Sequence, residues 1–179
     1  LTAREVFSLD GTEYECFTTS GGLGSLWQSL EGKVDHLVYK TIRYPGHLEL
    51  ISFLFEDLKM RQHKDELVAI LDRAIPTTTD DVVLIVITAI GRKNGKLTEE
   101  TLSWRIEGRE VAGAPMTAIQ VTTAGSIVAM VELLLQDFLP KAGFVRSEDV
   151  PLSAFLNTHY GQLYGSPARS SIASQARAA

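Results

Sequence analysis

Alternating and continuous apolar runs predict β-strands in two regions of the chain. Asp10-Gly11 is a strong signal for a two-residue turn, and alternating segments flank it, so residues 4–18 predict a β-hairpin. The run that begins at Val82 is uninterrupted and largely β-branched, which predicts a central strand covered on both faces. The Asn94-Gly95 pair then turns the chain into an alternating return strand.

Helical spacing of apolar residues predicts three longer helices, at residues 48–58, 65–75 and 124–138. Thr122 or Thr123 would cap the third helix. Apolar side chains cover nearly its whole circumference. We therefore expect this helix to be buried within the domain or in an interface with another domain or subunit.

The stretch at residues 40–47 joins a predicted strand, residues 34–42, to the first of these helices. Pro45 has no N–H and disfavours helical angles in the residue before it, so the strand should end there. Gly46 allows a tight turn into the helix. The free amides of the first turn and the positive end of the helix dipole would together favour a small anion.

Two side chains of this stretch suit anion binding and proton transfer. Arg43 is a planar, two-pronged donor that matches a carboxylate or a phosphate. His47, in the first helical turn, can donate, accept or relay a proton near neutral pH. The alternatives are that both lie on an ordinary surface turn, or that Arg43 forms a structural ion pair with an acidic neighbour.

A glycine-rich loop at residues 18–25 precedes a short helix at 26–30. It is not a dinucleotide loop, because the third glycine of G-x-G-x-x-G would fall at Trp27. The loop could line a pocket, with Ser20 or Ser25 as the helix cap. Plain turn chemistry is the alternative.

Composition places the chain among ordinary soluble globular domains, with 45% hydrophobic and 22% charged residues in 179. A net charge of −5 argues against nucleic acid or an anionic membrane as a partner. The apolar run at residues 127–135 is interrupted by Glu132 and is too short to cross a bilayer. Cys16 is the only cysteine, which excludes an intrachain disulfide and fits a cytoplasmic location. No spacing of His, Asp or Glu indicates a metal site.

Three segments together resemble the C-terminal domain of the saccharopine dehydrogenase family, and most closely its lysine 6-dehydrogenase branch. They are the glycine-rich loop at residues 18–26, the stretch at 40–47 and the strand that follows Asp81. In the second segment Ile42 replaces the leucine that is usual in that branch. The resemblance covers residues 4–164, and we expect residues 165–179 to be a mobile tail, or one ordered only by a neighbour.

The resemblance implies an α+β fold with a mixed or antiparallel β-sheet and helices packed on it, of the type of the C-terminal domain of glyceraldehyde-3-phosphate dehydrogenase. Residues 1–164 would be the substrate-binding and dimerisation domain of a nicotinamide-dependent oxidoreductase that acts on the C–N bond of lysine, saccharopine or a related amino acid. Arg43 would hold the substrate carboxylate, and His47 is the candidate catalytic base. The other pocket residues would be Tyr44, Gly46, Ser20, Gly22, Leu23 and Gly24.

In that family an N-terminal Rossmann domain binds most of the NAD or NADP. The glycine fingerprint of such a domain is absent from these 179 residues. We therefore expect no cofactor site in this chain, which would be part of a longer cytoplasmic enzyme and a homodimer. The alternative is a stand-alone module without catalytic activity, which binds a small carboxylate or forms a homodimer through the helix at 124–138.

Overall fold

The computed structural model describes residues 2–19, 21–169 and 173–175. These residues fall into two compact units. The first is built from stretches within Leu1–Leu23, Asp35–Thr77 and Ser171–Ala179, and the second from stretches within Gly24–Val34 and Thr78–Ser170. Each unit contains a small antiparallel sheet and several helices, which confirms the α+β class. The assignment of residues 1–164 to one domain stays a prediction.

The first unit is centred on a four-stranded antiparallel sheet with the order β3-β2-β1-β9. Asp10 and Gly11 both have positive φ, 51° and 79°, so the predicted hairpin turn is confirmed. Cys16 is buried in this sheet, as a small apolar residue would be. The strands are β1 (Thr2–Leu9), β2 (Thr12–Thr18), β3 (Thr41–Arg43) and β9 (Ala173–Gln175).

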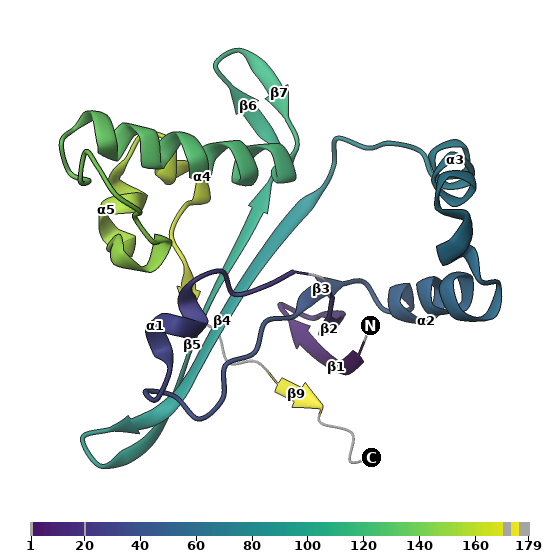
Figure 1. Ribbon diagram of the computed structural model, residues 1–179, viewed down its shortest axis with the longest axis horizontal. Helices are drawn as coiled ribbons and strands as arrows, with labels where there is room; N and C mark the ends of the chain where they lie inside the picture. Colours follow the sequence, from purple (N-terminus) through teal and green to yellow (C-terminus); the bar gives the residue numbers. More distant parts are fainter. Residues whose placement is uncertain (1, 20, 170–172, 176–179) are drawn as a thin grey trace. The chain divides into compact units, whose positions relative to one another are not determined.

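The strand predicted for residues 34–42 is wrong over most of its length. Only Thr41–Arg43 is extended and paired, because only these three residues find partners on β2. The helices that follow are confirmed with small shifts of their ends (Figure 1). They are α2 (His47–Ser52), the π-helical turn η1 (Phe53–Asp57), the 3-10 turn η2 (Met60–His63) and α3 (Lys64–Ala74).

The second unit contains a long hairpin, β4 (Val82–Lys93) and β5 (Lys96–Glu107), closed by Asn94-Gly95 as predicted. The strand order β4-β5-β8 makes β4 an edge strand, so the prediction of a central strand is wrong. An apolar run does not show how many neighbours a strand has. The other strands are β6 (Arg109–Val111), β7 (Ala114–Met116) and β8 (Ala168–Arg169).

Helix α4 (Ala118–Leu135) packs on the end of this hairpin farthest from its turn, where Trp104, Ile106 and Val121 form the core. The helix begins six residues earlier than predicted, and Thr117 caps it in place of Thr122 or Thr123. The smaller helices of the unit are α1 (Leu26–Leu30), η3 (Ser147–Asp149), α5 (Leu152–Asn157) and η4 (Gly161–Tyr164).

By length and composition α4 could cross a membrane, and it is the only helix in the described part of the chain for which this holds. This corrects the sequence estimate, which considered a shorter apolar run. One third of the helix is buried inside the structure, and a core helix of a soluble protein would pass the same test.

Two stretches of the tail beyond residue 164 form short strands, and the mobility of the tail stays a prediction. Ala168–Arg169 pairs with β5, and Ala173–Gln175 pairs with β1. Backbone hydrogen bonds hold such strands, so a shortage of apolar side chains does not prevent them.

Candidate functional site

The register between β2 and β3 sets the geometry of the candidate site in the first unit. Glu15 lies opposite Arg43, and Phe17 lies opposite Thr41. Because alternate residues of a strand share a face, these four side chains lie on one face of the sheet. Arg43 is the last residue of β3, and the chain enters α2 three residues later.

The Arg43 side chain is exposed and has no carboxylate partner among the described residues. Its Nη1 atom donates a hydrogen bond to the carbonyl oxygen of Ile42, at 2.7 Å. The guanidinium group carries further N–H donors that this contact does not use. The alternative in which Arg43 forms a structural ion pair is therefore not what the described residues adopt.

The buried carboxylate of Glu15 occupies the N-terminus of α2. Oε1 accepts a hydrogen bond from the Leu48 N–H at 2.7 Å, and Oε2 accepts one from Arg4 Nε at 2.8 Å. The Gly46 N–H also bonds to this carboxylate. The prediction that these amides are free for an external anion is therefore wrong, because the chain supplies its own anion.

The hydrogen bonds to Glu15 outweigh the effect of burial on its acidity. Burial alone would raise the pKa of the Glu15 carboxyl. The Leu48 and Gly46 amides and the Arg4 guanidinium together hold this pKa below its usual value. Glu15 is therefore ionised at neutral pH, and its charge is already compensated by Arg4 and the helix end.

Gly46 caps α2 with a φ of +96°, a left-handed conformation that favours glycine. This confirms the predicted tight turn. Tyr44, one residue beyond β3, is exposed, and its ring centroid lies 5.5 Å from that of Tyr14. Tyr44 thus contacts an aromatic residue of the sheet while more than half of its surface stays exposed.

The imidazole ring of His47 stacks on Phe17, with ring centroids 6.1 Å apart and an interplanar angle of 16°. Partial burial and the positive charge of Arg43 lower the pKa of His47, and the charge of Glu15 opposes them. The imidazole is therefore neutral at pH 7 and able to accept a proton.

The start of the glycine-rich loop is anchored close to this face. Thr19 Oγ1 lies 2.9 Å from Thr41 Oγ1, and Thr41 precedes Arg43 by two residues, about 7 Å along a strand. Gly21 lies so close to the Tyr39 ring that an added Cβ atom would come within 2.6 Å of it. The start of the loop is thus held beside β3.

The remaining predicted loop residues are placed differently. Gly22 is exposed and Leu23 is half-buried, both in the first unit. Gly24 belongs to the second unit, and Ser20 lies outside the described residues.

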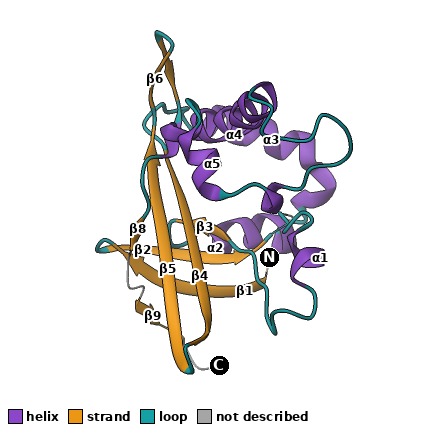
Figure 2. Cartoon of the chain, turned by 90° about the vertical axis from the view of Figure 1, so that its left-hand side faces the viewer, coloured by secondary structure: helices purple, strands orange, loops and turns teal. Residues whose placement is uncertain are grey.

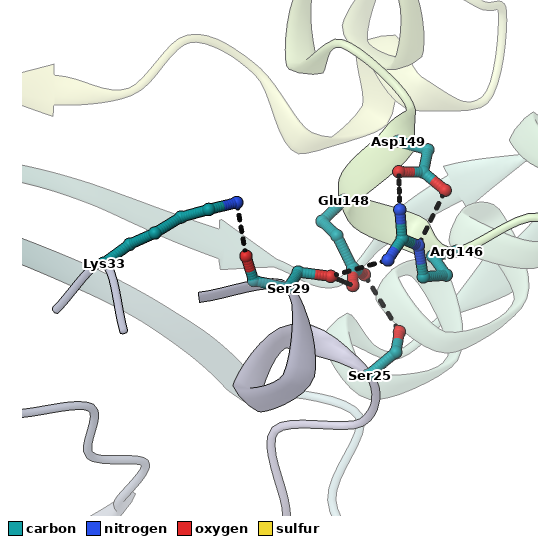
Figure 3. Close-up of polar contacts among 6 residues, drawn as sticks. All are labelled: Ser25, Ser29, Lys33, Arg146, Glu148 and Asp149. Carbon is teal, nitrogen blue, oxygen red and sulfur yellow. Dashed lines mark hydrogen bonds and ion pairs between the residues drawn. The ribbon is translucent and has the colours of Figure 1, made fainter. Parts of the chain in front are cut away.

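Sequence reasoning missed a polar cluster in the second unit, where α1 meets residues 146–149 (Figure 3). Ser29 Oγ donates to Glu148 Oε1 at 2.5 Å and accepts from Arg146 Nη1 at 3.1 Å. Ser25, predicted as a helix cap, instead donates to Glu148 Oε2 at 3.0 Å. Arg146 also pairs through two nitrogens with Asp149. The charged run at 146–149 was the only sequence signal of this cluster, whose groups satisfy one another.

The described residues do not fit a dinucleotide bound in the Rossmann manner. Their strands pair antiparallel, and the glycine-rich loop leads into a helix of only five residues. No group of three or more His, Cys, Asp or Glu side chains that could hold a metal ion occurs in the described parts of the chain.

No protein-family model matches the chain, and no solved structure matches it.

Proposed function

We propose that this chain is the substrate-binding and dimerisation part of a nicotinamide-dependent oxidoreductase, similar to the saccharopine and lysine dehydrogenases, that acts on the C–N bond of lysine, saccharopine or a related amino acid. One observation supports this most strongly. Arg43 is exposed and has no ion pair among the described residues, while the adjacent Glu15 is compensated by Arg4 and the start of α2. The guanidinium is thus available for the carboxylate of a ligand.

In this proposal Arg43 orients the amino acid by holding its carboxylate through two parallel hydrogen bonds. His47 accepts a proton as the C–N bond is oxidised, a role that suits an imidazole whose pKa is lowered. Tyr44, Gly46 and residues 21–23 of the glycine-rich loop, all in the first unit, line the pocket. NAD or NADP binds to another domain of a longer cytoplasmic enzyme, since these residues do not fit a dinucleotide.

The test is the effect of Arg43→Ala on the enzyme that contains this chain. We expect the KM for the amino acid to rise by about one to three orders of magnitude, the effect of losing a charge-assisted bidentate contact, with no change in cofactor affinity. Arg73→Ala is the matched control, because Arg73 is exposed in the same unit and its Nε also donates to a single backbone carbonyl. Equal KM values for the two variants would exclude Arg43 from the site.

Calorimetric titration of the 179-residue chain tests whether the cofactor binds to another domain, as the proposal requires. We expect no heat with NADH, and weak or no heat with L-lysine, because half of the site lies elsewhere. Clear NADH binding would contradict the proposal, since it would require a dinucleotide site in this chain.

A stand-alone assembly module is the second candidate, and the outer face of α4 favours it. Opposite the buried side of the helix, Ile127, Val131, Leu134 and Leu135 are exposed and follow a spacing of three and four residues. Such a face suits a helix of a second copy. This candidate requires dimers that form without any other domain, which sedimentation equilibrium of the isolated chain would detect.

A further inference from the structure

The part of the β4–β5 hairpin next to its turn, residues 87–97, has no third strand or helix packed on it in the described structure. In the described structure β4 pairs only with β5, and β8 pairs only with Leu102 and Ser103 of β5. Figures 1 and 2 both show the hairpin turn at the opposite end of the ribbon from α4. Every residue from 87 to 97 is exposed. A two-stranded ribbon is at best marginally stable by itself, so this one needs a partner.

Over residues 82–91 the free edge of β4 lacks two of the features that usually keep other strands away. Residues 82–91 contain no charged residue and no proline. The exposed ribbon also carries three large apolar side chains, Ile87, Ile90 and Leu97, which are 53%, 68% and 73% exposed. A row of unpaired backbone groups flanked by apolar side chains is a template for strand addition.

The charges at the two ends of β4 indicate which strand would complement it. Asp80 and Asp81 precede the strand, and Arg92 and Lys93 end it. In an antiparallel pair of two β4 strands centred on Ile87, residue 81 of one copy lies opposite residue 93 of the other. Acidic and basic ends then meet, whereas parallel pairing would bring like charges together.

Two of these charged side chains are available for such contacts. Asp80 and Arg92 form no ion pair within the described residues, and they become diagonal neighbours across the new pair. Asp81 and Lys93 are already engaged, with the first amides of α4 and with Glu100. Asp81 and Lys93 contribute to the pairing only through their electrostatic field at the two ends of the strand.

We propose that β4 pairs with β4 of a second copy of this chain, antiparallel and about a two-fold axis at Ile87. The two three-stranded sheets then form one six-stranded sheet, through an isologous contact that pairs the free edge of β4. This inference specifies the dimerisation part of the proposed function. It uses no residue of the Arg43 site, so the Arg43→Ala test and the tests below can fail separately.

Disulfide cross-linking tests the register. In a Cys16→Ser background, Ile87→Cys places two thiols beside the axis, where Cα atoms of an antiparallel pair are about 4.5–5.5 Å apart, within the range for a disulfide. Leu97→Cys is the control, because Leu97 is more exposed than Ile87 but lies on β5, away from the axis. We expect at least tenfold more cross-linked dimer for Ile87→Cys. Equal yields, or none from folded protein, would overturn the proposal.

Sedimentation equilibrium of charged variants tests the interface itself. Ile87→Lys together with Ile90→Lys is expected to weaken self-association at least tenfold, whereas Ile127→Lys on the outer face of α4 leaves it unchanged. If the α4 variant alone separates the copies, the interface lies on α4 and the β4 proposal is wrong. If the unaltered chain is monomeric up to millimolar concentration, something other than a second copy covers the edge, and the proposal is also wrong.

Discussion

Glu15→Gln removes the negative charge at the N-terminus of α2 and keeps the shape of the side chain nearly unchanged. The carboxylate accepts hydrogen bonds from two backbone amides and from Arg4. A hydrogen bond to a charged group contributes about 1.5–3 kcal/mol, roughly twice a neutral one. The amide of glutamine would keep one acceptor but direct an NH₂ group at a donor. The Arg4 contact counts for less, because that side chain is half-exposed and screened by solvent. We expect a loss of about 2–3 kcal/mol in the free energy of unfolding.

Thermal unfolding followed by circular dichroism measures this loss. For a chain of this size about 2–4 °C corresponds to each kcal/mol, so Tm should fall by about 4–12 °C. Glu13→Gln is the matched control, because Glu13 is an exposed carboxylate on the same strand, and its change should stay within about 0.5 kcal/mol. If the two variants unfold at the same temperature, Glu15 does not stabilise α2 and the geometry described above is wrong.

The pH dependence gives a second, independent readout for Glu15. Its pKa in the folded chain lies below that of the unfolded chain, so folding favours the ionised form. The stabilisation is complete at neutral pH, above the unfolded value, and is lost as pH falls through the folded pKa. The difference between the unaltered chain and Glu15→Gln should therefore shrink below about pH 4.

Three further predictions follow from the turn and from the α4 cap. Gly46→Ala should lower the free energy of unfolding by about 1–2 kcal/mol, because φ at this position is +96°. Gly22→Ala should lower it much less, because Gly22 has open space around it and an ordinary φ. Equal losses in urea unfolding would contradict this. Because the pKa of His47 is lowered in the folded chain, the neutral imidazole stabilises the fold fully above about pH 6.5, and this stabilisation is lost as pH falls through the folded pKa. An NMR titration midpoint above about 6.5 for His47 would refute the lowered pKa. Thr117→Ala should lower the free energy of unfolding by about 1 kcal/mol, and Thr123→Ala should leave it nearly unchanged. The reverse result would place the helix cap at Thr123, as the sequence suggested.

Features that depend on neighbouring residues could be predicted from the sequence. The Asp10-Gly11 and Asn94-Gly95 turns both adopt the positive φ values that their residue types favour. Helix α3 follows its apolar spacing to within one residue at each end. Gly46 turns the chain into α2 in the way that its freedom of φ allows.

Features that depend on distant partners could not be predicted in this way. Residues 34–40 resemble a strand in composition, but only Thr41–Arg43 meets β2. The apolar run of β4 suggested a buried central strand, whereas the sheet leaves that strand at an edge. Strand position and pairing length are set by how the whole chain packs, which no local pattern records.

The candidate site shows the same division most clearly. The sequence by itself determined that a turn with an arginine, a histidine and a helix start would exist at residues 43–47, because proline restricts the backbone there and glycine permits a tight turn. Only the tertiary structure decided which anion meets that helix. The β2–β3 register carries Glu15 to the Leu48 amide, 33 residues away along the chain, so the helix end meets an internal anion, and Arg43 has no carboxylate partner among the described residues.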